Sequence, residues 1–153
     1  MKRLTLLIFV SAFFWATQAS GHNQDSIVGQ WYTAEGTSLV EIYKCLDFYC
    51  GRIVWLKNPR NEKGKDKIDE KNPDESLRNR KLLGLQILNG FTYEGENKWE
   101  GGKIYDPKSG KTYSCKMQLE DGTLRVRGFV GFSLLGRTTV WTKKDASNNR
   151  SNE

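Results

Sequence analysis

The sequence predicts an all-β fold, an eight-stranded up-and-down antiparallel barrel. Three observations support this prediction. From residue 28 onward, short segments alternate apolar and polar residues, turn-forming residues separate them, and only one connection is long. Closing eight strands into a barrel removes the exposed edges that a flat sheet would leave. A two-sheet sandwich is the alternative, but it usually needs more than one long crossover connection.

The first half of the barrel comes from four short segments on either side of two turns and one long connection. These expected strands are 28–33, 38–45, 51–57 and 84–91. Residues 34–37, which include Gly36, form the first turn. The second and third strands flank a tight turn between Cys45 and Cys50.

The second half has the clearest turn residues and the clearest alternation. Its expected strands are 97–105, 111–119, 123–130 and 137–143. The turn 106–110 has Pro107 and Gly110 where a tight reversal needs them, and Asp121-Gly122 is typical of a hairpin. Strand 111–119 places one apolar set on a single face: Tyr113, Cys115, Met117 and Leu119.

The connection 58–83 is longer than most loops and carries 8 basic and 6 acidic residues. Its second half predicts a short helix over 73–80. Asn72 suits the cap, Pro73 the first helical position, and Glu75 the place that a capping box requires. For 58–71 a solvated loop without regular structure is an equal alternative. The acidic residues of this connection lack the spacing of a calcium-binding loop, so we expect no metal here.

The first nineteen residues predict a signal peptide, 1–19. Lys2 and Arg3 precede the mostly apolar run 4–15, and Thr17-Gln18-Ala19 fits a cleavage site. The run is shorter than the roughly 20 residues of a membrane-spanning helix, which disfavours the alternative of an N-terminal anchor. We therefore expect an exported protein, periplasmic or extracellular, with a barrel domain over 20–143 and a polar, disordered tail over 144–153.

The chain has 3 Cys and 1 His among its 153 residues. In an oxidising compartment, Cys45 and Cys50 are expected to form a disulfide across a hairpin. Cys115 is then a buried single cysteine, with no histidine to activate it, since His22 lies near the N-terminus. The remaining acid and base candidates are Glu41, Glu100 and Asp106. Glu41 and Glu100 could form an acid/base pair only if both faced inward, and we expect solvated side chains instead. We predict no enzyme activity, no metal and no cofactor.

Up-and-down topology places the long connection, the turn 106–110 and the connection 131–136 at one end of the barrel. This end is the expected mouth, and tight turns close the other end as a floor. The connection 131–136 is unusually apolar. Phe132, Leu134 and Leu135 either plug the barrel or pack under the helix of the long connection, or they form a ligand portal or a weak membrane contact.

Several motifs carry a resemblance to a known family. Gly29-Gln30-Trp31 is similar to the signature of lipocalins, in which a basic residue covers the tryptophan at the floor. The resemblance implies that Lys143 has this role here, at a position where an arginine is more usual. Almost the whole chain after the signal resembles the bacterial secreted family called domain of unknown function 2147. The motifs that match include Cys50-Gly51-Arg52, Asn72-Pro73-Asp74, 99–107, 110–113, 124–128 and 135–141.

The resemblance implies a lipocalin-like barrel that binds a small hydrophobic ligand, and it implies no catalytic residues. One departure is that no amphipathic helix follows the last strand, so a barrel wall would be bare. Our main hypothesis is an exported protein that holds an apolar or amphipathic molecule. The candidate ligand contacts are Tyr43, Trp55, Ile87, Lys103, Tyr105, Lys111, Tyr113, Cys115, Met117, Val126 and Phe132.

The orientation of two basic candidates stays open. Lys103 and Lys111 could hold a carboxylate, although an outward orientation is favoured for both. The alternative function is an envelope interaction or structural protein with a side-chain-filled barrel. Nucleic acid is not an expected partner, because the net charge of +6 is modest and acidic residues are interspersed among the basic ones.

Overall fold

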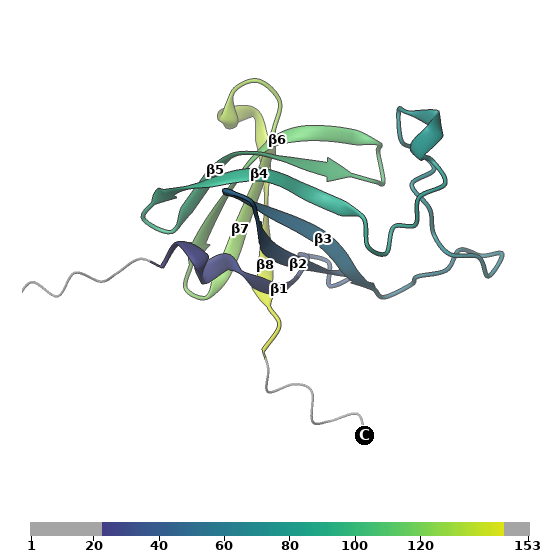
Figure 1. The fold of residues 1–153 in the computed structure, drawn as a ribbon, viewed down its shortest axis with the longest axis horizontal. Coiled ribbons are helices and arrows are strands. Elements are labelled where there is room, and N and C mark those ends of the chain that lie inside the picture. Colours follow the sequence, from purple (N-terminus) through teal and green to yellow (C-terminus); the bar gives the residue numbers. More distant parts are fainter. Residues whose placement is uncertain (1–22, 146–153) are drawn as a thin grey trace, which may run out of the picture.

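Eight antiparallel strands close into one barrel in the computed structural model, which describes residues 23–145 (Figure 1). Each strand pairs with the next, and the last returns to the first, which confirms the predicted topology. The predicted signal peptide 1–19, His22 and tail residues 146–153 lie outside the described residues. The strands are β1 Gly29–Tyr32, β2 Ser38–Cys45, β3 Phe48–Leu56, β4 Gln86–Gly95, β5 Lys98–Asp106, β6 Lys111–Glu120, β7 Thr123–Phe129 and β8 Gly136–Lys143.

Most strand bounds agree with the prediction to within one residue, and two hairpins are longer than expected. β3 begins at Phe48 rather than at residue 51, and β4 continues to Gly95 rather than ending at residue 91. Two-residue turns make both extensions possible. Glu96 and Asn97 adopt φ of 48° and 59°, a left-handed turn that keeps β4 and β5 paired to their ends.

The expected disulfide is present at the β2–β3 hairpin. Cys45 and Cys50 are bonded, with their Cα atoms 5.8 Å apart. Cys115 is free and buried, as its place in the alternating strand indicated. The bonded pair therefore staples a hairpin at the floor end, while the single cysteine lies inside the barrel.

The predicted helix over 73–80 is wrong. Only the short 3-10 turn η2 Glu75–Leu77 forms, and Asp74 caps it by accepting a hydrogen bond from the Ser76 amide. The Asn72 oxygen accepts a hydrogen bond from the Asp74 amide at 2.9 Å, one residue before the turn, while the Asn72 side-chain amide donates to Asp69 at 2.8 Å. The chain then turns back so that the Asp69 amide donates to the Arg80 carbonyl, and this return leaves no room for a longer helix.

A buried carboxylate ties the 58–83 connection to the outside of the barrel. Asp69 is 0% exposed and accepts hydrogen bonds from Tyr105, at 2.5 Å, and from Arg80, at 2.9 Å. Burial raises the pKa of Asp69, but hydrogen bonds from Tyr105, Asn72 and Arg80 outweigh burial and hold the pKa below 3.8. Gly110 allows the connection to approach the β5–β6 turn, because a Cβ there would lie 1.9 Å from the Lys71 carbonyl oxygen.

The floor of the barrel is closed by aromatic side chains and by the 3-10 turn η1 Gln24–Ile27. The indole nitrogen of Trp31 donates to the Ile27 carbonyl at 2.8 Å, and that of Trp99 donates to the Gln24 carbonyl at 3.1 Å. The Lys143 ammonium lies 5.4 Å from the centroid of the Trp31 ring. The predicted pairing of Trp31 with Lys143 is therefore present in the structure, next to Gly29.

Small residues make space for this packing. A Cβ on Gly102 would lie 2.4 Å from the ring of Phe91, and one on Gly51 would lie 2.8 Å from Leu88. Phe91 and Leu88 are both fully buried, so neither can move aside easily. Glycine is needed at these positions for packing, and Gly102 does not have a left-handed backbone conformation.

Replacing Gly102 tests this packing. We expect Gly102→Ala to lower the free energy of unfolding by about 1–3 kcal/mol, because the added methyl group overlaps the Phe91 ring. Urea unfolding measures the change, and Lys103→Ala is the matched control because Lys103 is exposed. Equal stability of the two variants would contradict the packing argument.

Asp69 predicts a specific dependence of stability on pH. Its folded-state pKa lies below the unfolded value of about 3.9, so its contribution is complete above that value and is lost as the pH falls through the folded-state pKa. We expect Asp69→Asn to be less stable than wild type at pH 6 by about 1.5–3 kcal/mol. The gap should narrow below pH 3.8.

Urea unfolding at several pH values between 2.5 and 6 measures this gap. Exposed Glu62 lies in the same connection, so Glu62→Gln serves as the control. A gap between wild type and Asp69→Asn that stayed constant over the whole range would refute the role given to the carboxylate.

Candidate ligand-binding site

A partly open cavity of about 350 Å³ lies at the mouth of the barrel, opposite the floor. Strands β5 to β8 and the β7–β8 connection form its walls. The alternation of each strand decides which side chains face it: Ile104 pairs with Tyr113, and Val126 pairs with Thr139. The lining residues are Ile104, Asp106, Tyr113, Val126, Gly128, Phe129, Val130, Leu135, Arg137 and Thr139.

The bottom of the cavity rests on the packed core. The Thr139 hydroxyl accepts a hydrogen bond from the Trp141 indole at 3.1 Å, which engages both side chains. Cys115 and Met117 are buried in this core and do not line the cavity. Gly128 keeps the space open, because a Cβ there would lie 3.4 Å from Ile104. The cavity is thus a recess above a filled barrel.

Most polar groups at the rim are already engaged. Asp106 accepts hydrogen bonds from the Lys108 amide at 3.0 Å and from the Ser109 hydroxyl at 2.6 Å, which fixes the β5–β6 turn. Lys108 forms an ion pair with Glu35 at 2.9 Å. The hydrogen bond and charge of Lys108, and to a smaller extent the charge of Arg137, lower the pKa of Glu35.

Arg137 differs from its neighbours at the rim. It begins the inward face of β8, and within residues 23–145 its guanidinium has no hydrogen-bond or ion-pair partner in contact. Glu35 interacts with it electrostatically. A charged guanidinium above apolar walls can form charge-assisted hydrogen bonds with an anionic group of a bound molecule. The arrangement therefore fits an amphipathic ligand with a negative end.

Two of the predicted contacts line the cavity, and three lie in the core. Tyr113 and Val126 line it. Ile87, Cys115 and Met117 are buried in the core cluster without reaching the cavity. Their inward or buried position agrees with the prediction, but the side chains that surround them fill the space a ligand would need.

Three other predicted contacts lie on the outer face of the barrel, and this corrects the prediction. Tyr43 contacts Gln86 and Arg52 on the outside of the barrel. Its neighbour in β2, Ile42, is buried, and adjacent side chains of a strand point to opposite faces. Lys103 is exposed between inward Gly102 and Ile104. Tyr105 points outward to Asp69.

The last three predicted contacts are also displaced. A bulge shifts the register between Leu39 and Val40, and Trp55 consequently lies on the outer wall with 42% of its surface exposed. Lys111 and Phe132 are exposed and do not line the cavity.

Arg137 was not predicted as a site residue, although the alternation of the last strand indicates that it points inward. Residues 137, 139, 141 and 143 share one face of a strand. Because Lys143 was already expected over Trp31 inside the floor, Arg137 had to point inward at the mouth. Ile104 and Thr139 were missed for a different reason, since their importance depends on where the core stops, and Asp106 was considered only as an acid.

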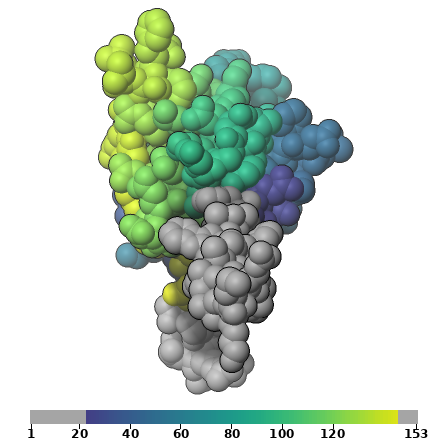
Figure 2. All heavy atoms as spheres, turned by 90° about the vertical axis from the view of Figure 1, so that its left-hand side faces the viewer, coloured from purple at the N-terminus to yellow at the C-terminus, as the bar shows by residue number. Residues whose placement is uncertain are grey.

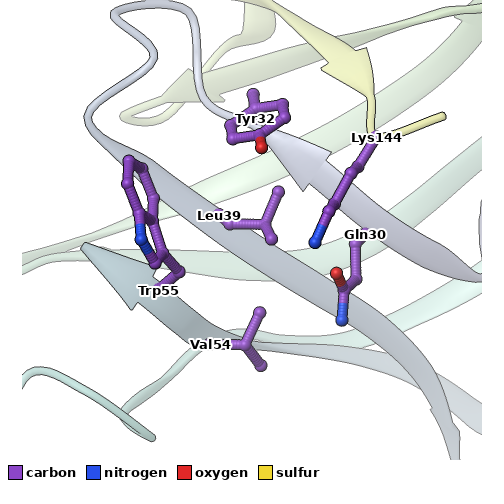
Figure 3. A pocket seen from close by; sticks show the side chains of 6 residues that line it. All are labelled: Gln30, Tyr32, Leu39, Val54, Trp55 and Lys144. Atoms are coloured by element: carbon purple, nitrogen blue, oxygen red, sulfur yellow. The ribbon is translucent and has the colours of Figure 1, made fainter. Parts of the chain in front are cut away.

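A second hollow of about 370 Å³ lies on the outer wall of β1 to β3, and Figure 3 shows its six side chains. The rings of Tyr32 and Trp55 meet edge to face at 6.1 Å, beside buried Leu39. Gln30 and Lys144 form the polar border. No helix covers this wall within residues 23–145.

The described residues contain neither a metal-binding group nor a membrane-crossing helix. No cluster of three or more His, Cys, Asp or Glu side chains that could hold a metal ion occurs in residues 23–145. The same residues contain no helix with the length and apolar character needed to cross a membrane.

Comparison with known proteins identifies a family and a solved structure with a similar fold. Residues 29–143 match the family described as "Uncharacterized protein conserved in bacteria (DUF2147)". A solved structure of protein HP1028 from Helicobacter pylori, described as belonging to the lipocalin family, is similar with a TM-score of 0.69. The similarity has 23% sequence identity and covers 79% of this chain and 84% of that chain, which shows a shared fold. No curated protein matches this sequence.

The buried thiol below the cavity allows a direct test of its chemistry. Burial raises the pKa of Cys115 to about 12, so at pH 8 only about one thiol in 10⁴ is ionised. We expect iodoacetamide to alkylate Cys115 at least about 100-fold more slowly in the native protein than in guanidinium chloride, because the thiolate is the reactive form.

The rate is measured by mass spectrometry without reductant, so that the bonded Cys45 and Cys50 stay unreactive. Native alkylation within tenfold of the unfolded rate would show that Cys115 is accessible and reactive. That result would reopen a nucleophilic role for it.

Proposed function

Because the chain belongs to the bacterial DUF2147 family and has a lipocalin-like barrel, we propose that it binds a small amphipathic molecule with a negatively charged end. One observation carries this proposal. The mouth cavity combines apolar walls with the uncommitted guanidinium of Arg137. The apolar part of the ligand would lie between Ile104, Val126 and Leu135, and its charged end would lie at Arg137.

The size and openness of the cavity limit the ligand. Its volume of about 350 Å³ is at the lower end of the usual range of about 300–1,000 Å³ for small-molecule sites. Trp141, Met117 and their neighbours fill the barrel below it, so a long chain cannot reach the floor. The proposal is therefore a single short apolar chain, with its charged end near the opening.

The charges of the rim favour one orientation. Asp106, on β5, would repel an anionic group, whereas Arg137, on β8, would attract it. Asp106 is also held by two hydrogen bonds of its own turn. An anionic end at β8 with the apolar chain toward β5 and β6 satisfies both groups.

We further propose that the protein acts by binding rather than by catalysis, and that it is exported. The Cys45–Cys50 disulfide is typical of an oxidising compartment, and the segment 1–19 has the pattern of a signal peptide. The raised pKa of Cys115 and the hydrogen bonds that already hold Asp106 leave no activated nucleophile or general base at the cavity. The proposal does not involve nucleic acid or a cofactor.

A role as an envelope interaction or structural protein is the second candidate, favoured by the exposed apolar connection that contains Phe132 and Leu134. In that case the cavity would have no ligand, and the packed lower barrel would serve only as a support.

Three probes with the same ten-carbon chain test the first candidate: decanoate, decanol and decyltrimethylammonium. We expect decanoate to bind most tightly in isothermal titration calorimetry. Arg137→Gln should weaken decanoate at least about tenfold, or ~1.4 kcal/mol, and leave decanol almost unchanged. Gly128→Val should weaken decanoate and decanol together, because its side chain occupies the cavity.

Matched controls lie on the outer face of the same strands. Arg125→Gln removes an exposed arginine of β7, and Ser114→Val adds the same side chain outside the cavity as Gly128→Val adds inside. Neither control should change binding. Absence of binding by all three probes, or equal effects of Arg137→Gln and Arg125→Gln, would refute the proposal.

A further inference from the structure

The β7–β8 connection is an apolar tip. The name "tip" is used here for residues 130–135. Phe132, Leu134 and Leu135 are 81%, 89% and 80% exposed, and Val130 beside them is exposed as well. Figure 1 shows the connection extending beyond the barrel, and Figure 2 shows the same yellow-green segment projecting from the surface. The expected plug, or packing under the 58–83 connection, is wrong, because all three side chains are at least 80% exposed and only Leu135 of the three borders the cavity.

The backbone of the tip is held in this form by Arg127. Its guanidinium donates to the carbonyls of Ser133, at 2.8 Å, and Leu134, at 3.2 Å, and to the Thr138 hydroxyl, at 2.8 Å. The 3-10 turn η3 Ser133–Leu135 follows from these bonds and from the Leu135 amide, which donates to the Phe132 carbonyl. Since the polar backbone groups are turned inward, the apolar side chains project together.

Two basic residues lie next to the tip, which carries no charged side chain of its own. Residues 122–144 contain no Asp or Glu, and of their five basic residues Arg127 and Arg137 lie at the tip, whereas Lys143 and Lys144 lie at the floor end. Asp106 and Glu35 are acidic residues near Arg137. Arg137 directly follows the tip, and Arg127 lies beneath it. Apolar side chains beside basic groups are the combination that binds an anionic membrane surface, through burial of the former and attraction of the latter.

The shape of the tip separates a membrane from a protein partner. A projecting point without a recess offers little area for a specific protein interface, which usually buries about 800 Å² per partner. A bilayer accepts a projecting apolar point without a complementary surface. The charge and the shape together therefore favour lipid.

We propose that the tip inserts into the headgroup region of an anionic lipid bilayer, with Phe132 and Leu134 at the acyl boundary. Val130 and Leu135 belong both to the tip and to the cavity wall. Docking would therefore place the mouth of the cavity against the bilayer. Resting on the function proposed above, this arrangement would let an amphipathic ligand pass between membrane and cavity, with Arg137 at the level of the anionic headgroups.

A fluorescent probe at the tip tests the contact. Leu134→Cys labelled with a nitrobenzoxadiazole group should shift to the blue and brighten with vesicles of phosphatidylcholine and phosphatidylglycerol at 70:30. Cys115 is buried and Cys45 is bonded to Cys50, so the label is confined to the tip. The chain used is 20–153, because the apolar run 4–15 would itself enter vesicles and the barrel closes within 23–145.

Binding is measured by co-sedimentation with the same vesicles. The variant Phe132→Ser with Leu134→Ser should lower the partition coefficient at least about tenfold, and pure phosphatidylcholine or 0.5 M salt should also lower it. The control Leu46→Ser with Phe48→Ser removes two exposed apolar side chains at the floor end and should bind as wild type. Decanoate binding in solution should be unchanged in both variants.

Three results would overturn the membrane contact: no binding of wild type to anionic vesicles, equal loss in both double variants, or a wild-type dimer in sedimentation that the tip variant dissolves. The last would assign the tip to a second copy of the chain. Vesicle binding without decanoate binding would support the membrane contact of the tip and refute the proposed ligand binding. Decanoate binding without vesicle binding would do the reverse.

Discussion

The barrel depends on closure of its shortest strand against its last. β1 has four residues, and only Trp31 and Tyr32 pair with β8. So short a ladder contributes few hydrogen bonds, and side chains supply the rest of the closure. Lys143 covers the face of the Trp31 ring, the Trp31 indole nitrogen donates to the Ile27 carbonyl, and Trp99 donates to Gln24 of the same η1 turn. Floor packing and strand closure are thus one structural unit.

This floor decides where a ligand can be held. Large side chains from facing strands meet over η1 and fill the lower barrel, with Gly51 and Gly102 giving them room. Toward the mouth, the inward positions carry Gly128, Thr139 and Ile104, whose smaller side chains line the cavity instead of filling it. The cavity therefore results from a change in side-chain size along the strands, at unchanged strand spacing.

The two connections at the mouth take different positions because one is charged and the other is apolar. The 58–83 connection is charged, and its buried Asp69 binds it to Tyr105 on the outer wall, so it does not line the cavity. The tip has no charged side chain of its own and stands beside the opening. Arg127 provides its backbone with partners, and the apolar side chains then have no protein surface to cover them within residues 23–145.

The strands, the antiparallel order, the disulfide and the pairing of Trp31 with Lys143 were determined by the sequence itself. The first three depend on local alternation, on a turn, or on a spacing of a few residues, whereas the pairing of Trp31 with Lys143 followed from the resemblance to lipocalins. The tertiary structure decided the outward position of Trp55, since one bulge reverses the faces of a strand. It also replaced the 73–80 helix with a single turn, because the backbone bond from Asp69 to Arg80 folds the connection back on itself, and the bonds of Asp69 and Asn72 to Tyr105 hold it on the outer wall. The cavity belongs to this second group: alternation shows which residues point inward, whereas only the packing of eight strands together shows which of them leave space.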